Sequence, residues 1–294
     1  DRTFANLADH FNEWAYSLLD AATKTVNGEI RQCIERGGDA EKLAELQSQE
    51  TIAKAVFDET IPAYFLIEGL EIDFYFSDMA DQYPGQLLAY KEQFTNIYQH
   101  VHFFLDPRQL FRIWHASTFR IDDVLLGSDK IGHFTDMGMN YYREYAAALK
   151  AGKTKEEAMA AGVAVGTHGI LFSERGAVGY LSAGAYSNGD MASNYLGFKF
   201  YLNLTEPVML NGTMHEPMLV RDGEYWKMAP YVRRDSDFFS AFVCNHYNEA
   251  LNPSLFENDM RKSVRKALED RSERILNRYV DANGNRQAQQ YFAA

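Results

Sequence analysis

The sequence predicts a mainly α protein: a single multi-helix domain over residues 1–294 with a small β-hairpin or meander insertion near residues 207–230. Three observations lead to this class. Apolar residues recur at three- and four-residue spacing along most of the chain, as on one face of a helix. Capping residues, glycines and prolines bound these segments. Strand-like runs separated by turn dipeptides occur only between Pro207 and Pro230.

Residues 1–60 are expected to form an N-terminal helical pair. The first helix covers about 4–34, because large apolar side chains repeat there at helical spacing, at Leu7, Phe11, Trp14 and Leu18. Gly37 and Gly38 end it, and Asp39 is placed to cap a second helix over about 40–57. Pro62 then suits the first turn of an aromatic-rich helix over about 63–79.

The central section, residues 61–205, is predicted to hold further helices over about 86–105, 107–114, 128–150, 155–172 and 190–204. Ser128 is a good N-cap for the helix that runs to about residue 150. Thr154 and Glu157 have the spacing of a capping box, which opens the next helix. Residues 173–189 are rich in glycine and are expected to form a loop or a partly helical turn.

The insertion, residues 206–232, carries the turn dipeptides Asn211-Gly212 and Asp222-Gly223 between strand-like runs, which favours a hairpin or a meander. C-terminal helices are expected within 233–280, over about 235–250 and 255–279. The last segment, 281–294, is polar and is expected to fray.

Composition excludes several functions. The net charge is −12 with a pI near 5.1, which argues against a nucleic-acid partner, since phosphates need clustered basic residues. The longest apolar run, 159–172, is too short to span a bilayer, so no membrane-spanning role is expected. The chain begins at Asp1 rather than at methionine, so we expect that an upstream segment was removed, either by processing, as in an exported protein, or by trimming of the sequence. Cys33 and Cys244 fit no zinc or redox spacing, and whether they pair stays open.

The stretch 127–134 places polar side chains on one stripe of its helix. Taking 100° per residue, His133, Asp136 and Asn140 fall close to Asp129, whereas apolar side chains fall on the opposite face. One interpretation is an ordinary solvent-facing stripe. The other is a site, because short, stiff side chains suit fixed geometry better than the Lys and Glu of a typical wet face.

A second polar motif lies at residues 188–197, where Asp190 and Asn194 stand one helical turn apart. Asp190 is also where an N-cap residue would belong. A histidine flanked by carboxylates has its charged form stabilised, so its pKa rises and it can act as general acid or base. The same groups can ligate a divalent metal, which is the candidate cofactor, its identity left open. The candidate catalytic residues are Asp129, His133, Asp190 and Glu174, with Asp136, Asn194 and Lys130 in support.

These motifs resemble those of VanZ-like proteins and related uncharacterised bacterial envelope lipoproteins. The matching positions lie within Gly127–Phe200 and are Asp129, Lys130, His133 and Phe134, then Glu174, then Asp190, Asn194 and Gly197. VanZ-like proteins are embedded in the membrane, whereas this chain shows no spanning segment. The resemblance implies a bacterial cell-envelope setting, periplasmic or secreted.

The leading hypothesis is therefore a hydrolase of the bacterial envelope, in which His133 acts as general acid or base, or as a metal ligand, on an envelope-derived substrate. An alternative is a non-catalytic binding or scaffold protein that uses the β insertion, with Tyr225 and Trp226, as its contact surface. A third hypothesis is a secreted effector or toxin.

Overall fold

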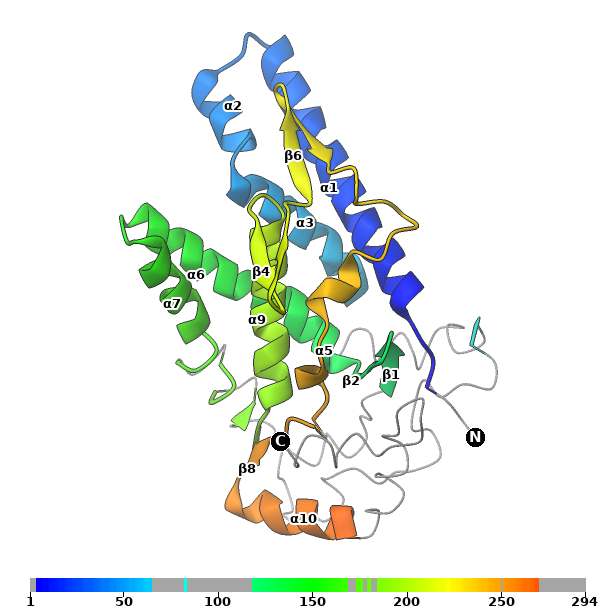
Figure 1. The fold of residues 1–294 in the computed structure, drawn as a ribbon. Coiled ribbons are helices and arrows are strands. Elements are labelled where there is room, and N and C mark those ends of the chain that lie inside the picture. Colours follow the sequence, from blue (N-terminus) through cyan, green and yellow to red (C-terminus); the bar gives the residue numbers. More distant parts are fainter. Residues whose placement is uncertain are drawn as a thin grey trace.

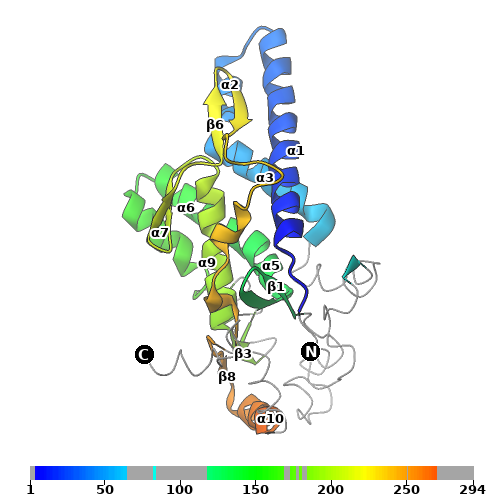
Figure 2. The same cartoon turned by 45° about the vertical axis from the view of Figure 1, so that its right-hand side comes forward.

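The computed structural model describes residues 4–64, 82–83, 118–168, 173–176, 179–180, 184–249 and 251–269. Long helices dominate this part of the chain, and its strands form small two-stranded antiparallel sheets (Figures 1 and 2). The predicted fold class is confirmed. The predicted helices over 86–105 and 107–114 lie outside the described residues, as does the polar tail, 281–294.

Three helices, rather than two, make up the N-terminal section: α1 (Ala8–Glu35), α2 (Ala40–Leu46) and α3 (Gln49–Tyr64). The side chain of Asp39 caps α2, as predicted, by accepting hydrogen bonds from the amides of Glu41 and Lys42. The prediction of one helix over 40–57 is wrong. Ser48 interrupts it, because its hydroxyl accepts a hydrogen bond from the amide of Thr51 and starts α3. Pro62 lies in the last turn of α3, so its predicted place in a first turn is also wrong.

A hairpin precedes the first polar motif and was not predicted. It joins β1 (Thr118–Ile121) to β2 (Val124–Gly127), and β1 also pairs with the chain just before α1 through Leu7 and Arg120.

The helix that follows has three parts: α5 (Asp129–Gly132), the π-helical turn η3 (His133–Met137) and α6 (Gly138–Lys150). Ser128 does not cap it, because its hydroxyl has no hydrogen-bond partner in the described chain.

The next helices are α7 (Lys155–Ala164) and α9 (Asn188–Asn203), and both pack against α6 (Figure 1). The capping box of Thr154 and Glu157 is present, with both of its hydrogen bonds. Ser187, not Asp190, is the N-cap of α9, since its hydroxyl accepts a hydrogen bond from the Asp190 amide. Asp190 therefore lies inside the first turn, and its carboxylate is free for other contacts.

Aromatic side chains fill the core between α1, η3 and α9. Phe11 stacks on Phe119 and Phe239, while Phe134 contacts Phe200 and Phe239. All five are fully or almost fully buried. Burial of each such ring stabilises the fold by roughly 1.5–3 kcal/mol. This packing holds the start of the polar helix against α9, because Phe134 is adjacent to His133 in the chain.

The β insertion consists of two hairpins, as the turn dipeptides indicated. One pairs β4 (Val208–Leu210) with β5 (Thr213–His215), and the other pairs β6 (Leu219–Asp222) with β7 (Tyr225–Met228). Asn211 and Gly212 both have positive φ, which matches the type I′ turn that this dipeptide favours. The β6–β7 hairpin lies along α1 (Figure 2).

The C-terminal helix predicted over 235–250 is wrong. Residues there form two short 3-10 turns, Phe239–Phe242 and Asn245–Tyr247. Phe238, Phe239 and Phe242 are all buried, and the side-chain oxygen of Asn12 accepts a hydrogen bond from the backbone amide of Phe239. This contact with α1 replaces the regular helical hydrogen bonding. Farther on, β8 (Leu255–Phe256) pairs with β3 (Ala185–Tyr186), and α10 (Asn258–Glu269) follows.

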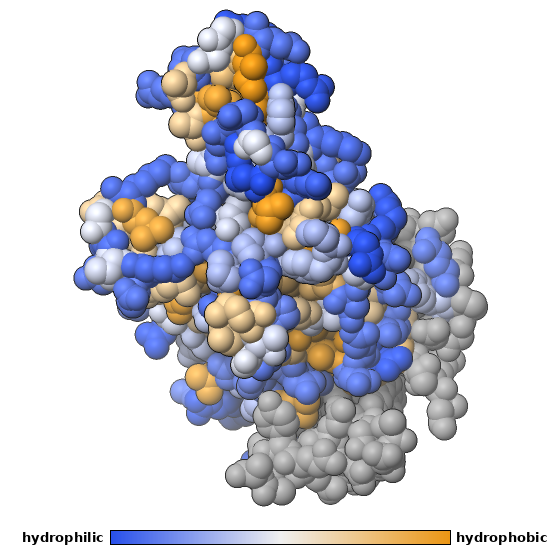
Figure 3. Space-filling view, turned by 45° about the horizontal axis from the view of Figure 1, so that its top comes forward, coloured by the Kyte–Doolittle hydropathy of each residue, from blue (hydrophilic) through white to orange (hydrophobic). Residues whose placement is uncertain are grey.

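On the face drawn in Figure 3, hydrophilic side chains predominate and apolar ones are scattered among them. None of the helices in the described segments combines the length and the apolar character needed to cross a membrane. Cys33 and Cys244 are both free thiols.

Candidate functional site

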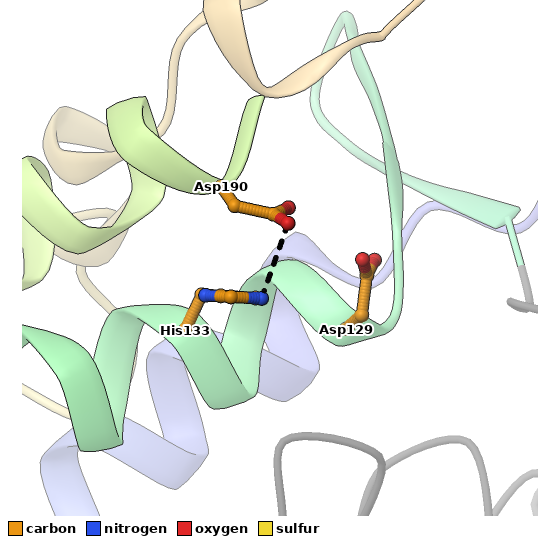
Figure 4. Close-up of side chains that lie close together, drawn as sticks. All are labelled: Asp129, His133 and Asp190. Carbon is orange, nitrogen blue, oxygen red and sulfur yellow. Dashed lines mark ion pairs between the residues drawn. The ribbon is translucent and has the colours of Figure 1, made fainter. Parts of the chain in front are cut away.

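The two polar motifs meet where the start of the α5–η3–α6 helix crosses the start of α9. Nε2 of His133 lies 3.3 Å from Oδ2 of Asp190, and both residues are buried (Figure 4). Asp129, one turn before His133, faces the same space, and its side chain is 21% exposed. The interpretation of this stripe as a solvent face is therefore wrong at its N-terminal end, which faces α9.

Glycines allow this close crossing. A Cβ atom at Gly197 would overlap the carbonyl oxygen of Phe134, and one at Gly138 would lie 2.6 Å from the carbonyl carbon of Gly197. The backbones of η3 and α9 are thus nearly in contact. Gly197, the last residue of the second motif, serves this approach and carries no chemistry of its own.

In a π-helical turn the backbone does not form the regular i→i−4 hydrogen bonds of an α-helix, so some of its carbonyl groups need other hydrogen-bond partners. The hydroxyl of Tyr201 donates to the carbonyl of Thr135 at 3.2 Å, and the hydroxyl of Ser193 donates to the carbonyl of Lys130. Both donors come from α9. The irregular turn is therefore secured by the same helix that supplies Asp190.

Lys130 is the centre of the charge network. Its ammonium group is almost fully buried and lies 2.7 Å from Oδ2 of Asp129, 2.5 Å from Oδ1 of Asp190 and 3.0 Å from Oε1 of Glu249. Burial lowers the pKa of Lys130, but these three carboxylates outweigh it and raise the pKa well above its usual value. Lys130 therefore remains charged and fixes the orientation of both aspartates.

Glu249 and Ser187 belong to the site, although they were not among the predicted residues. The Ser187 hydroxyl donates to Oε1 of Glu249 at 2.7 Å while it caps α9. The four-residue pattern from Ser187 to Asp190 is that of a capping box, which could have placed Asp190 at the third position of the helix. The local signal at Glu249 is its spacing from His246, a His-x-x-Glu pattern that is common by chance, and the contact with Lys130 is what joins this carboxylate to the site.

Glu174 lies behind His133 with no exposed surface, and neither of its carboxylate oxygens has a hydrogen-bond partner among the described residues. Its Oε1 is 3.7 Å from Nδ1 of His133. Burial raises the pKa of Glu174 to about 7, and the charge of Asp190 adds to this, whereas His133 opposes it.

Asn194 is fully buried, and its carboxamide faces Nδ1 of His133 at 3.0 Å. With its oxygen toward the ring, the amide accepts a hydrogen bond from Nδ1, and its nitrogen donates to the Tyr141 hydroxyl at 3.4 Å. The reverse orientation fits the surrounding groups better, because the nitrogen then donates to Nδ1 and to the carbonyls of His133 and Asp190. The amide orientation thus decides which ring nitrogen of His133 carries the proton.

Burial lowers the pKa of His133, but the carboxylates of Asp190 and Glu174 outweigh it, and the pKa is raised above its ordinary value. A group with such a pKa can take up and release a proton near neutral pH, which suits acid–base catalysis. The raised pKa that the sequence predicted for this histidine agrees with the arrangement of the charges around it.

Asp136 is the predicted supporting residue that the structure does not join to this network. It forms no ion pair or hydrogen bond within the described chain that links it to the other acids. Burial raises its pKa to about 7, partly offset by the positive charges of His133 and Arg143.

One group of side chains in the described chain has the geometry to hold a metal. Asp129, His133 and Asp190 each offer one ligand atom, and these atoms lie within 4.8 Å of one another. Of the seven predicted site residues, the structure brings six together: Asp129, Lys130, His133, Glu174, Asp190 and Asn194.

Comparison of the chain with protein-family models, with curated proteins and with solved structures finds no match.

Proposed function

We propose that this chain is a hydrolase whose catalytic centre is the cluster around His133. The observation that carries the proposal is the 3.3 Å approach of His133 Nε2 to Asp190 Oδ2 from two separate helices. Hydrolysis needs a group that activates water, either a base or a bound metal, and His133 suits both roles. Asp129 and Asp190 flank the reacting region, and Glu174 and Asn194 support the ring from behind.

The cost of building this cluster supports a functional role. Burying a charged group away from water is unfavourable by several kcal/mol unless it is well paired. Here Lys130 and Glu174 are both buried, and Glu174 lacks hydrogen-bond partners among the described residues. Perturbed acids and bases of this kind concentrate at functional sites.

The setting we propose is the bacterial cell envelope, periplasmic or secreted, with an envelope-derived molecule as substrate. This part of the proposal rests on the resemblance of the two motifs to those of VanZ-like proteins.

The alternative of a binding or scaffold protein has less support. Its contact surface would include Trp226, but this side chain is buried, and its ring nitrogen donates to the carbonyl of Leu46 at 3.5 Å. The β6–β7 hairpin thus uses its tryptophan to pack on the N-terminal helices.

The effector hypothesis would be tested separately, by expressing the chain in a host cell and scoring growth.

The test is product formation. Purified protein is incubated with bacterial envelope fractions, and mass spectrometry follows species whose summed mass exceeds that of the parent by one water. We expect His133→Ala and Asp190→Asn to lower the rate at least about 100-fold, a typical loss for an acid–base group. His168→Ala, which removes an exposed histidine elsewhere, is the matched control and should leave the rate unchanged.

Circular dichroism confirms that each variant is folded before its rate is compared. Full activity in folded His133→Ala and Asp190→Asn variants would show that the cluster is not the catalytic centre.

A further inference from the structure

We infer that Asp129, His133 and Asp190 bind one divalent transition-metal ion. This inference deepens the proposed function, because it assigns the water-activating group of that same site. It rests on three features of the described residues: the free ligand atoms, the balance of charge and the support behind the histidine.

The free ligand atoms are those that Lys130 leaves unused. Its ammonium group holds Oδ2 of Asp129 and Oδ1 of Asp190. The other oxygen of Asp129 is buried and lacks a hydrogen-bond partner in the described chain, and Oδ2 of Asp190 lies 3.3 Å from His133 Nε2. Two ligands that each lie about 2.0–2.2 Å from a tetrahedral metal are separated by roughly that distance. His133 and Asp190 are therefore already spaced for a shared ion, and the ligand atom of Asp129 lies within 4.8 Å of both.

The charge balance also favours a cation. With His133 in its neutral, metal-binding form, one ammonium group faces the carboxylates of Asp129, Asp190 and the more exposed Glu249, so negative charge remains in excess. Opposite charges attract strongly where water is excluded, by about 4 kcal/mol for unit charges at 4 Å and an effective dielectric of 20. A divalent ion between Asp129 and Asp190 compensates the excess, while Lys130 orients the carboxylates around it.

The support behind the ring is of the kind that metal-binding histidines have. Such a histidine uses one nitrogen for the metal and donates the other N–H to a carboxylate or carbonyl oxygen. Without an ion, the Asn194 nitrogen fits best toward the ring, where it donates to Nδ1. Metal binding through Nε2 therefore requires the amide to turn its oxygen toward the ring, where it accepts from Nδ1 at 3.0 Å and leaves the lone pair of Nε2 for the ion. Glu174, fully buried and without a hydrogen-bond partner in the described chain, points at the same nitrogen from 3.7 Å.

The ligand set indicates the class of ion. One imidazole nitrogen and two carboxylate oxygens suit Zn²⁺ or Mn²⁺, with a remaining position open to water. Ca²⁺ takes six to eight oxygen ligands and Mg²⁺ keeps several waters, so both should bind more weakly here.

The experiment uses the full chain, stripped with a chelator and free of any affinity tag. Isothermal titration calorimetry with ZnCl₂ and MnCl₂ should show one site per chain, with MgCl₂ and CaCl₂ as comparison ions. We expect His133→Ala and Asp129→Asn to weaken Zn²⁺ binding at least 100-fold, and Glu174→Gln to weaken it about 10-fold, as substitutions behind a ligand do. His168→Ala is the control for adventitious binding and should have no effect.

A second measurement needs no variant. In protein labelled with ¹⁵N-histidine, one equivalent of Zn²⁺ should shift the ring nitrogen signals of one of the eight histidines. The inference is overturned if no stoichiometric Zn²⁺ or Mn²⁺ binding occurs, or if binding survives in both His133→Ala and Asp129→Asn. Metal binding without hydrolysis would uphold this inference and refute the proposed function, whereas hydrolysis that survives full chelation would do the reverse.

Discussion

The junction of α5 and η3 with α9 and the two hairpins of the β insertion differ in how their structure arises. The hairpins follow from short-range chemistry, since Asn211 and Gly212 adopt the positive φ angles that their turn requires. The junction depends on residues about sixty positions apart, because His133 meets Asp190 and Asn194, and Lys130 also meets Glu249. A few neighbouring residues are thus enough to specify the hairpin turn, whereas the buried polar cluster forms only when distant parts of the chain pack together.

The largest effect that would test this contrast is the removal of Lys130. Lys130→Met leaves three carboxylates without their shared cation, and we expect it to lower the free energy of unfolding by about 3–5 kcal/mol. Lys155→Met is the matched control, because Lys155 pairs with Glu206 at the surface, where such pairs contribute at most about 1 kcal/mol. Urea denaturation of both variants gives the comparison, and equal losses would contradict the central role of Lys130.

The next effect concerns the helix crossing. Gly197→Ala forces a methyl group into the carbonyl of Phe134, so we expect a loss of about 1–3 kcal/mol, as in overpacked cores. Gly28→Ala in α1 is the control, since nothing lies within 4 Å of its added Cβ, and it should be neutral or slightly stabilising. If Gly197→Ala is as stable as the native protein, η3 and α9 are not held as closely as the structure places them.

A smaller effect is expected in the insertion. Gly212→Ala places a side chain at a φ of +79°, which costs about 1–2 kcal/mol. Because the turn is local, the loss should not reach the site, and Zn²⁺ affinity measured by calorimetry should match that of the native chain. A large drop in Zn²⁺ affinity would mean that the insertion and the junction are coupled. It would contradict the view that the hairpin turn is determined locally and independently of the site.

The last effect is a change in pH dependence at Asp136. Burial raises the pKa of Asp136 from 3.8 to about 7, so folding takes up a proton between these values. The contribution of this group to the free energy of unfolding is therefore present below about pH 4 and is lost as the pH rises toward 7. Asp136→Asn should flatten this part of the stability profile in thermal melts, whereas Asp58→Asn, on the exposed part of α3, should not.

The fold class could be predicted because its signals are local. Helical periodicity, the cap at Asp39, the capping box at Thr154 and the Asn211-Gly212 turn all act within a few residues, and each is present in the structure. The helix predicted over 235–250 failed because three buried phenylalanines and the distant Asn12 decide its conformation. Helical propensity in such a segment is weaker than the gain from packing its aromatic rings.

Most of the candidate site could be predicted from residue types and spacing, since His133, Asp129 and Asp190 stand out as stiff polar groups on amphipathic helices. Glu249 could not, because only its contact with Lys130 distinguishes it. Asp136 shares the periodicity of the stripe, yet it makes no ion pair with the cluster in the described structure, and the π-helical turn beginning at His133 breaks the regular spacing on which the prediction relied.

The amino-acid order alone determined which segments coil, where many of them start and stop, and that acids and a histidine gather on two of them, because these properties depend on neighbouring residues. Tertiary packing decided that these groups are buried together around one lysine. Charges far apart in the chain interact strongly only after folding has excluded water from between them.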